Sequence, residues 1–190
     1  MYFLYLIIIF LGILVCAFFL TRTVLIMVSF FYKSPFVPLD KVLMQKALAL
    51  LKVSAKDKFL DIGCGDGRVV FKCFQDYPGA KRYKGIDIMT MLVAFAKIRK
   101  IFFGKNSKIV FEKADAMKYS YKGYNKVFMY LLTDFVAELM PKLEKELPSK
   151  AVVVSVIFPI PEIYKKTGNL SISEVESGNR TKKLYMWEKN

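Results

Sequence analysis

The sequence predicts an α/β domain built on a central parallel β-sheet and preceded by one N-terminal transmembrane helix. Three observations support this architecture. No charged side chain occurs from Met1 to Thr21, and most of these residues are apolar. From residue 40 onward, helical and strand-like patterns alternate, which is typical of a series of β-α-β units. The last two strand-like segments follow each other directly and indicate an antiparallel hairpin.

The N-terminal apolar run from Tyr2 to Leu20 is about as long as the hydrocarbon core of a bilayer requires. A secretory signal peptide needs a basic residue before a shorter apolar core, and no Lys or Arg precedes Arg22. The alternative, a buried hairpin of core helices, requires more partner surface than a chain of this length supplies. We therefore expect an uncleaved single-pass anchor. The domain is expected on the cytoplasmic side because the cations follow the span, at Arg22, Lys33, Lys41 and Lys46.

The junction between anchor and domain is marked by two prolines. Apolar character resumes after Arg22 and continues to Tyr32, so this stretch either extends the helix out of the bilayer or lies along the membrane surface. Pro35 and Pro38 then break any helix. We expect residues 1–33 to form the anchor with its juxtamembrane helix, and residues 34–190 to form the globular domain.

The first half of the domain predicts three helices and two strands. Asp40 is a suitable N-cap for a helix that ends near Val53, because apolar residues recur between them at helical spacing. The short apolar patterns of buried strands occur at 58–62 and 82–88. Helical spacing recurs at 66–77 and 90–103, and the second of these helices is amphipathic.

The second half predicts five strands and one helix. The expected strands lie at 108–112, 126–131, 151–158, 169–176 and 182–188. Residues 133–147 follow helical spacing. The third of the five strands is almost entirely apolar, as expected of a strand that is buried on both faces. The last two alternate polar and apolar residues and are joined by a turn at 177–180.

The composition excludes several classes of enzyme. There are 30 Lys and Arg against 16 Asp and Glu, with no His, which gives a formal net charge of +14. Without histidine, Ser-His-Asp and Cys-His triads, His-ligated zinc and a histidine general base are excluded. The positive charge favours an anionic partner, either lipid head groups or RNA. The three cysteines form no CxxC pair, so we expect reduced thiols and no metal site.

A glycine-rich loop joins the strand at 58–62 to the next helix. The sequence Asp61-Ile-Gly-Cys-Gly-Asp-Gly67 lets the backbone turn tightly and approach a ligand without an intervening Cβ. A dinucleotide fingerprint has the spacing GxGxxG, whereas these glycines are spaced GxGxG after an acidic residue. The loop therefore favours S-adenosylmethionine (SAM) over NAD. The cofactor contacts expected from it are Asp61, Gly63, Cys64, Gly65, Asp66 and Gly67.

Two further acidic residues close the next two strands of the predicted sheet. Asp87, followed by Ile88, lies where a carboxylate can accept hydrogen bonds from both ribose hydroxyls. Asp115 can accept from an adenine amino group, with the backbone N–H of Ala116 beside it. The Asp66 side chain either contacts the methionyl amine or caps the following helix, and Cys64 is interpreted as a loop filler. Each motif alone also fits a structural turn, but the three occur in order at successive strand ends.

On these motifs the sequence resembles the seven-β-strand, Rossmann-like class I methyltransferases over residues 40–190. The C-terminal antiparallel hairpin separates that fold from a plain Rossmann domain. More narrowly, the chain is similar to the membrane-tethered protein lysine methyltransferases. That family includes the mitochondrial enzymes that act on the ATP synthase c subunit and the adenine nucleotide translocase, and an archaeal relative. The similar segments are Pro35-Phe-Val-Pro38, Gly65-Asp-Gly-Arg68, Tyr130-Leu-Leu132 and Phe158-Pro-Ile-Pro161.

The resemblance implies methyl transfer from SAM to a lysine amine of a protein that lies in or near the same membrane. Such a reaction requires that the amine and the methyl group be aligned and that water be excluded. Phe36, Pro38, Phe158 and Pro159 are expected to form an apolar channel for the lysine, and Tyr130 is expected to orient it. An apolar wall lowers a lysine pKa by desolvation, and an aromatic ring can hold the amine by cation–π contact.

Two other functions share these features. A lipid or quinone methyltransferase would need a deep apolar pocket open to the bilayer, and a non-catalytic SAM-binding scaffold would dock partners on its basic surface. The Asn/Asp-Pro-Pro-Tyr/Phe signature of nucleobase and glutamine methyltransferases is absent at Met129-Tyr-Leu-Leu-Thr-Asp134, so nucleic acid is not the expected substrate. In a eukaryote the same architecture predicts the mitochondrial inner membrane with the domain in the matrix. The oligomeric state stays open.

Overall fold

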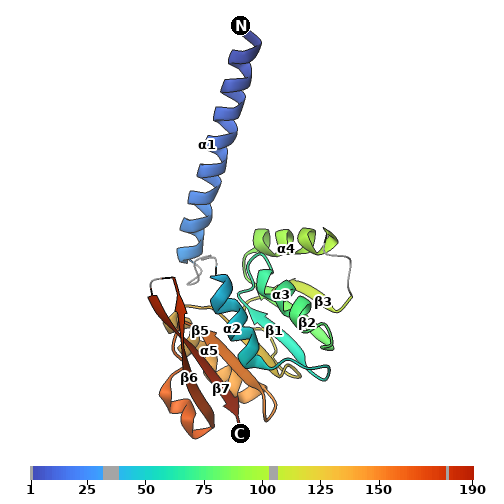
Figure 1. The fold of residues 1–190 in the computed structure, drawn as a ribbon, viewed down its shortest axis with the longest axis vertical. Helices are drawn as coiled ribbons and strands as arrows, with labels where there is room; N and C mark the ends of the chain where they lie inside the picture. The colour runs from blue at the N-terminus through green and yellow to red at the C-terminus, as the bar shows by residue number, and fades with distance from the viewer. Residues whose placement is uncertain (1, 32–38, 103–106, 179) are drawn as a thin grey trace. The chain divides into compact units, whose positions relative to one another are not determined.

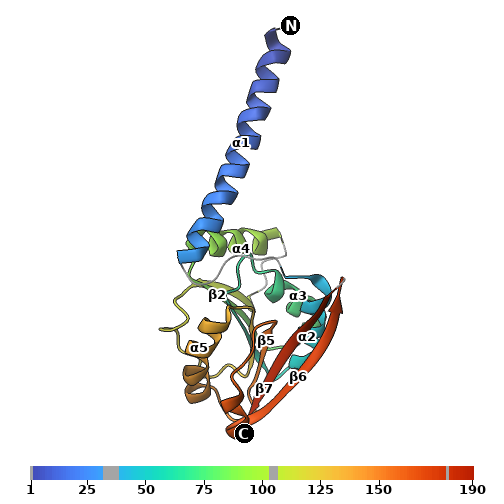
Figure 2. The same ribbon diagram turned by 90° about the vertical axis from the view of Figure 1, so that its left-hand side faces the viewer.

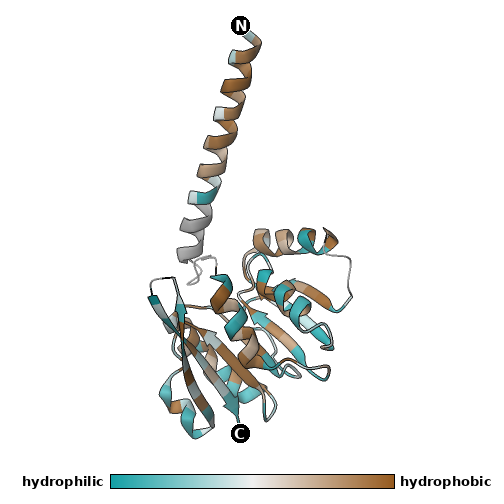
Figure 3. Ribbon diagram, viewed as in Figure 1, coloured by the Kyte–Doolittle hydropathy of each residue, from teal (hydrophilic) through white to brown (hydrophobic). Residues whose placement is uncertain are grey.

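The computed structural model describes residues 2–31, 39–102, 107–178 and 180–190, with only the backbone given for residues 24–31. The chain divides into two compact units, Met1–Val37 and Pro38–Asn190. The helix of the first unit, α1, spans Tyr2–Phe31 and continues past Arg22 without a break (Figure 1). Its stretch Tyr2–Thr23 is long and apolar enough to cross a membrane, and its hydrophobic residues are brown in Figure 3.

The second unit is built on a seven-stranded sheet with the strand order β3-β2-β1-β4-β5-β7-β6. The first five strands run parallel, whereas β7 is antiparallel to both β5 and β6. The parallel sheet and the C-terminal hairpin are therefore both confirmed. The strands span Lys58–Ile62 (β1), Arg82–Asp87 (β2), Ile109–Lys113 (β3), Lys126–Met129 (β4), Val152–Val156 (β5), Gly168–Ser177 (β6) and Arg180–Lys189 (β7).

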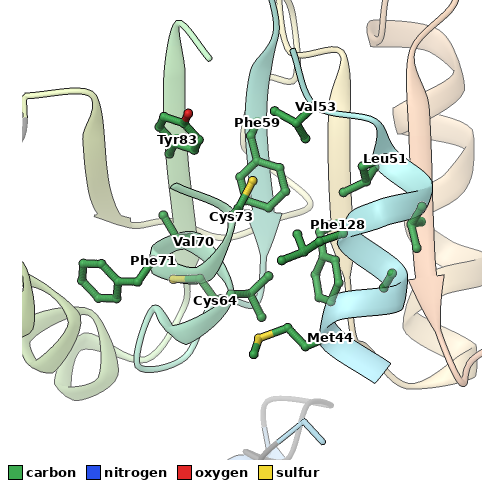
Figure 4. Close-up of a cluster of buried hydrophobic side chains, with 14 of the residues drawn as sticks. Met44, Leu51, Val53, Phe59, Cys64, Val70, Phe71, Cys73, Tyr83 and Phe128 are labelled. Atoms are coloured by element: carbon green, nitrogen blue, oxygen red, sulfur yellow. The ribbon is translucent and has the colours of Figure 1, made fainter. Parts of the chain in front are cut away.

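Helices cover both faces of this sheet, as Figure 2 shows. On one face, α2 (Lys41–Leu51), α3 (Arg68–Asp76) and α4 (Thr90–Phe102) contribute to one buried cluster with side chains of the sheet (Figure 4). On the other face, α5 (Thr133–Glu146) and the short 3-10 helix η1 (Glu162–Lys166) contribute to a second cluster. Burial on both faces explains why the central strands are apolar in sequence.

Several element ends differ from the sequence expectation, each for a local reason. Helix α3 begins at Arg68 rather than Asp66, because Gly67 takes a left-handed conformation with φ of 79°. Strand β5 ends at Val156 rather than Phe158, because the next residue, Ile157, has φ of 68° and leaves the extended region. The helix η1 was not expected, since its five residues are too few to show helical periodicity.

In addition to the pairing of β7 with β5, Trp187, the single tryptophan of the chain, connects the hairpin to η1. Its side chain is fully buried, and its indole N–H donates to the carbonyl oxygen of Tyr164 in η1 at 2.9 Å. Gly168 lies beside it, and a Cβ at that position would lie 2.3 Å from the indole nitrogen. Trp187 is therefore a built-in optical reporter of the folded domain.

Candidate functional site

The acidic residues singled out in the sequence lie at the carboxyl ends of β1, β2 and β3. Asp61 is in β1, Asp87 ends β2, and Asp115 follows β3 by two residues. The strand order reverses between β1 and β4, because β2 and β3 continue the sheet on one side of β1 and β4 and β5 on the other. In open α/β sheets, ligands bind outside the carboxyl ends of the strands at such a switch point.

The glycine-rich loop takes a backbone course that side chains cannot follow. Gly63, Gly65 and Gly67 have φ of 76°, 52° and 79°, all in the left-handed region. A Cβ at Gly63 would lie 2.7 Å from Leu131, and one at Gly67 would lie 2.6 Å from the ring of Phe111. Glycine is therefore needed in this loop for two reasons: the backbone is left-handed, and a Cβ would clash with neighbouring side chains.

Hydrogen bonds fix this loop against β2. The backbone N–H groups of Gly63 and Cys64 both donate to the carbonyl oxygen of Ile86, each at 2.9 Å. The N–H of Gly65 donates to Oδ2 of Asp87 at 2.8 Å, and that of Met89 donates to Oδ1 at 2.8 Å. Each carboxylate oxygen can accept a further hydrogen bond, so Asp87 keeps acceptor capacity for a ligand. Burial raises the pKa of Asp87, although these N–H donors oppose the shift.

Asp61 is a fully buried acid whose Oδ2 has no hydrogen-bond partner, the single such side-chain atom in the part of the chain that the structure describes. Burial, followed by the negative charges of Asp87 and Asp66, raises the pKa of Asp61 well above its usual value. Leaving a buried polar group unpaired costs about 1–3 kcal/mol. Because Oδ2 of Asp61 has no hydrogen-bond partner and lies beside the glycine-rich loop, it suits a ligand with a cationic donor such as an amine.

The Asp66 carboxylate is held by two arginines. It accepts from Nε and Nη2 of Arg68 and from Nη1 of Arg99, with all three distances at 2.9 Å. Burial raises the pKa of Asp66, but the hydrogen bonds and charges of the arginines outweigh this effect and leave it below the usual value. The same carboxylate accepts from the backbone N–H of Arg68 at 3.2 Å, which closes the turn before α3, although the N-cap of that helix is Gly67 and has no side-chain cap.

The third strand end also has a turn-forming acid. Oδ1 of Asp115 accepts from the N–H of Met117 at 2.9 Å, and Oδ2, on the same partly exposed side chain, lies 4.0 Å from Nζ of Lys118. Ala116 is partly buried, and its carbonyl oxygen accepts from the hydroxyl of Tyr121 at 2.7 Å. Ile88, directly after Asp87, is 36% exposed. An apolar surface and an acceptor at neighbouring strand ends suit a heterocyclic base with an amino group.

The side chain of Cys64 is buried in the hydrophobic core, beside Val70 and Phe71 in Figure 4. A Cβ at Gly85 would lie 2.8 Å from its sulfur, so the two residues fill the space jointly. Burial, together with the charges of Asp61 and Asp87, raises the pKa of the thiol well above its usual value. A buried, neutral thiol is compatible with the space-filling role expected from the sequence, and a cofactor contact from Cys64 would come from its backbone.

The aromatic pair expected beside a substrate lies together after β4 and β5. The rings of Tyr130 and Phe158 are 5.6 Å apart between centroids, at an interplanar angle of 35°. Both side chains are partly buried, and Pro159 is exposed. Burial raises the pKa of Tyr130, so its hydroxyl stays protonated. The expected channel residues Phe36 and Pro38 lie outside the described residues.

Sequence reasoning missed two features of this site. Arg99 reaches the loop from α4, 33 residues away in sequence from Asp66, and nothing in the pattern connects the two. Ile157, a β-branched residue with φ of 68°, precedes Phe158, and its N–H donates to the carbonyl oxygen of Lys183 at 2.8 Å. Such a conformation is an outlier for a β-branched side chain and is found where the surroundings impose it.

The fold agrees with that of a solved methyltransferase structure. The chain is 27% identical to the RNA methyltransferase from Salinibacter ruber, whose crystal structure contains S-adenosyl-L-homocysteine. That match covers 80% of this chain and 94% of the other, with a TM-score of 0.69. Fold and site together define an S-adenosylmethionine-dependent methyltransferase.

Comparison with related sequences identifies the family of methyltransferases to which the chain belongs. The chain is 32% identical to a protein-lysine N-methyltransferase of Saccharolobus islandicus over 155 residues, which is 80% of this chain and 92% of the relative. It is 30% identical to the adenine nucleotide translocase lysine N-methyltransferase of Mus musculus over 127 residues, which is 67% of this chain and 54% of that protein. Residues 61–167 match the family described as the ANTKMT methyltransferase domain. The chain belongs to this family, as the resemblance indicated.

Proposed function

We propose that this enzyme transfers a methyl group from SAM to lysine side chains of a protein, and that α1 anchors it in the same membrane as its substrate. The observation that carries the lysine assignment is the 32% identity to the archaeal protein-lysine N-methyltransferase over 92% of that protein's length. The membrane assignment is supported by Tyr2–Thr23, whose length and composition suit a membrane span.

The three strand ends supply complementary contacts for the parts of SAM. Asp87 would accept from the ribose hydroxyls with the lone pairs that Gly65 and Met89 leave available. Oδ2 of Asp61, buried and unpartnered, would accept from the methionyl amine. Ile88 would pack on the adenine, and Asp115 with the N–H of Ala116 would recognise its edge. We assign Asp66 a positioning role, because its carboxylate is already engaged by two arginines.

When bound, SAM supplies an electrophilic methyl group on a sulfonium, and no protein nucleophile is needed. The task of this chain is to bring a neutral amine into line with that methyl group and to exclude water. The half-buried pair of Tyr130 and Phe158 provides an apolar wall for the lysine stem. Removal of the amine from water lowers its pKa and favours the neutral nucleophile. The ring of Tyr130 offers a cation–π contact as positive charge develops on nitrogen.

The membrane anchor gives the reaction an advantage that is independent of contacts in the site. Confinement of enzyme and substrate to one bilayer raises their effective concentration. The cations that follow the span favour a domain on the cytoplasmic side, or in the matrix if the membrane is the mitochondrial inner membrane. The mouse relative has the adenine nucleotide translocase as the substrate in its name, and that translocase illustrates the kind of membrane-embedded target that we propose.

The test uses the full chain, purified in detergent and reconstituted with a membrane protein fraction and radiolabelled SAM. We expect the label to be in protein, to remain there after lipid extraction and nuclease treatment, and to map to lysine residues. Asp87→Asn should abolish it, whereas the exposed Asp76→Asn, which alters only a surface pair with Lys72, should not. Label in the organic phase would assign a lipid substrate, and label lost to nuclease would assign RNA. SAM binding without any transfer would indicate a scaffold.

A further inference from the structure

Helix α4 exposes a row of large apolar side chains to solvent. Only Val93 and Ala96 of its 13 residues are buried, and none is buried beyond the middle of the helix. The side chains in the exposed row are between 52% and 87% accessible, and they are Met91, Phe95, Ile98, Ile101 and Phe102. Isolated exposed apolar residues are common, but five on one helix form a patch of the kind that marks an interaction surface.

The spacing of these residues places them on one face of α4. At about 100° per residue, the five lie within an arc of about 120°. Lys97 borders this arc on one side and Arg99 borders it on the other. In Figure 3, α4, identified by its place in Figure 1, is coloured brown over much of its length and teal over a shorter part. A broad apolar face with flanking cations is the pattern of helices that lie in the plane of a membrane interface.

The sequence segment that contains α4 is charged with one sign only, although Arg99 of this helix pairs with Asp66 of the cofactor loop. From Ile88 to Phe111 the sequence has no Asp or Glu, and it has five cations, Lys97, Arg99, Lys100, Lys105 and Lys108. The whole chain has a formal net charge of +14. Anionic lipid head groups attract such a segment, at about 1 kcal/mol for each Lys or Arg near the surface.

We propose that α4 is a second membrane contact, whose apolar face enters the head-group boundary of an anionic bilayer. Nucleic acid fits this face poorly, because Phe95, Ile98 and Phe102 would meet phosphates. A second copy of the chain also fits poorly, since a two-fold contact would bring the same cations of both copies together. The proposal goes beyond the proposed function and does not depend on lysine as the methyl acceptor.

The chain itself keeps the domain close to such a surface if α1 spans the bilayer. Residues 24–37 separate the span from the domain, and eight helical residues followed by six in any conformation reach at most about 33 Å. That reach is similar to the diameter of about 30–40 Å of a domain of this size. Tethering therefore gives α4 a high local concentration of lipid head groups.

Contact through α4 would also orient the site. Figures 1 and 2 both place α4 across the end of the sheet at which β2 leads into it. Arg99 joins α4 to the cofactor loop through Asp66, whose carboxylate oxygen it approaches to 2.9 Å. A bilayer against the apolar face of α4 would therefore hold the carboxyl end of the sheet near the membrane surface, where side chains of membrane proteins emerge.

The experiment measures the depth of α4 with tryptophan. The full-length Phe102→Trp variant is reconstituted in vesicles that contain about 30% anionic lipid, with either normal or brominated acyl chains. Trp187 is fully buried and gives a constant background emission, which also reports that the domain is folded. The matched control is Ile163→Trp, at an apolar side chain that is 67% exposed on η1.

We expect brominated lipid to reduce the emission of the residue 102 tryptophan at least about twofold and to leave the control within about 20% of its value, because acyl-chain quenchers act only at membrane depth. Quenching should weaken in neutral vesicles and in the double variant Lys97→Glu with Lys100→Glu. Ile98→Trp serves as a second probe if Phe102→Trp does not fold.

Two results would overturn the proposal. One is quenching at residue 102 by soluble iodide and not by brominated lipid. The other is protection from both quenchers that increases with protein density, which would assign the face to a second copy. Insertion of α1 is measured separately, by resistance of the chain to carbonate extraction, so failure of the anchor and failure of α4 are distinguishable.

Discussion

Replacement of Asp61 by asparagine should stabilise the ligand-free enzyme at neutral pH and weaken its binding of SAM. Oδ2 of Asp61 is buried without a partner, and burial raises the pKa of this acid well above its usual value. Asparagine keeps the shape and removes the buried charge. Asparagine is neutral at every pH and so avoids the cost of burying this charge or of keeping the acid protonated at neutral pH, and we expect the free energy of unfolding to rise by about 1–2 kcal/mol. Loss of a charged partner for the methionyl amine should weaken SAM binding about tenfold or more.

Asp57 provides a matched control, because it is a second buried acid one residue before β1. It accepts from the N–H and the hydroxyl of Ser54 at 2.7 and 2.8 Å and from Nδ2 of Asn125 at 2.6 Å. Burial raises the pKa of Asp57, but these hydrogen bonds outweigh that effect and lower it overall. Asp57→Asn should therefore destabilise the domain by about 1–3 kcal/mol, opposite in sign to Asp61→Asn.

The pH dependence separates the two aspartates. The pKa of Asp61 in the folded protein lies above its unfolded value of about 3.9, so the folded state holds this proton more tightly. The wild type therefore loses stability through Asp61 as the pH rises from about 4 to the folded pKa, and Asp61→Asn does not. The difference in free energy of unfolding between Asp61→Asn and the wild type should therefore grow over that pH range and vanish below about pH 4.

The assay is denaturant unfolding of the full chain in detergent, followed by the emission of Trp187, with SAM affinity from titration calorimetry. Trp187 belongs to the domain, so the transition reports on the domain alone. Equal destabilisation by Asp61→Asn and Asp57→Asn would refute the reasoning, because it would show that Asp61 has a stabilising partner. Unchanged SAM affinity in Asp61→Asn would refute the assignment of its carboxylate to the amine.

Three further predictions concern the loop and the substrate wall. Gly67→Ala should lower the free energy of unfolding by about 2–4 kcal/mol and abolish SAM binding, because the new Cβ clashes with Phe111 and the backbone is left-handed. Gly178→Ala is the control: φ is 60° there as well, but the space around it is open, so the same assay should show a loss of only about 1 kcal/mol. In a methyl-transfer assay, Tyr130→Ala should lower kcat about 100-fold and leave the SAM affinity within about threefold of the wild-type value. Tyr130→Phe should keep most of the activity, because the aromatic ring and not the hydroxyl contacts the substrate amine. An equal loss of activity in both variants would contradict this. Arg99→Ala should weaken SAM binding about threefold to tenfold by calorimetry, with a stability change below about 1 kcal/mol, because it removes one of two arginines from the partly exposed pair with Asp66; an unchanged affinity would show that Arg68 suffices.

Sequence patterns predicted the order of elements because each element of the sheet leaves a local signature. Strands that are buried on both faces are short apolar runs, and the hairpin alternates, so both were identified without tertiary information. The ends of the elements were predicted less accurately. The left-handed residues Gly67 and Ile157 end or delay elements through backbone conformation, which an apolar pattern does not encode.

The candidate site was predicted in part for the same reason. In a parallel sheet the carboxyl ends of strands meet at one edge, so Asp61, Asp87 and Asp115 had to come close together. The partner of each acid was beyond prediction. Asp66 was expected to meet the cofactor or cap a helix, and the structure joins it to Arg68 and Arg99, the latter from a different helix.

By itself, the sequence determined the class of this protein: a glycine loop and three strand-end acids in an alternating α/β chain, after an apolar segment long enough to span a bilayer. These features are local, and the local spacing of residues fixes them. Only the tertiary structure showed that Asp61 has a carboxylate oxygen without a partner, that Asp66 is paired with arginines, and which face of α4 is exposed to solvent. Those properties depend on neighbours that are distant in the chain, because burial and hydrogen bonding are set by packing between elements and not within them.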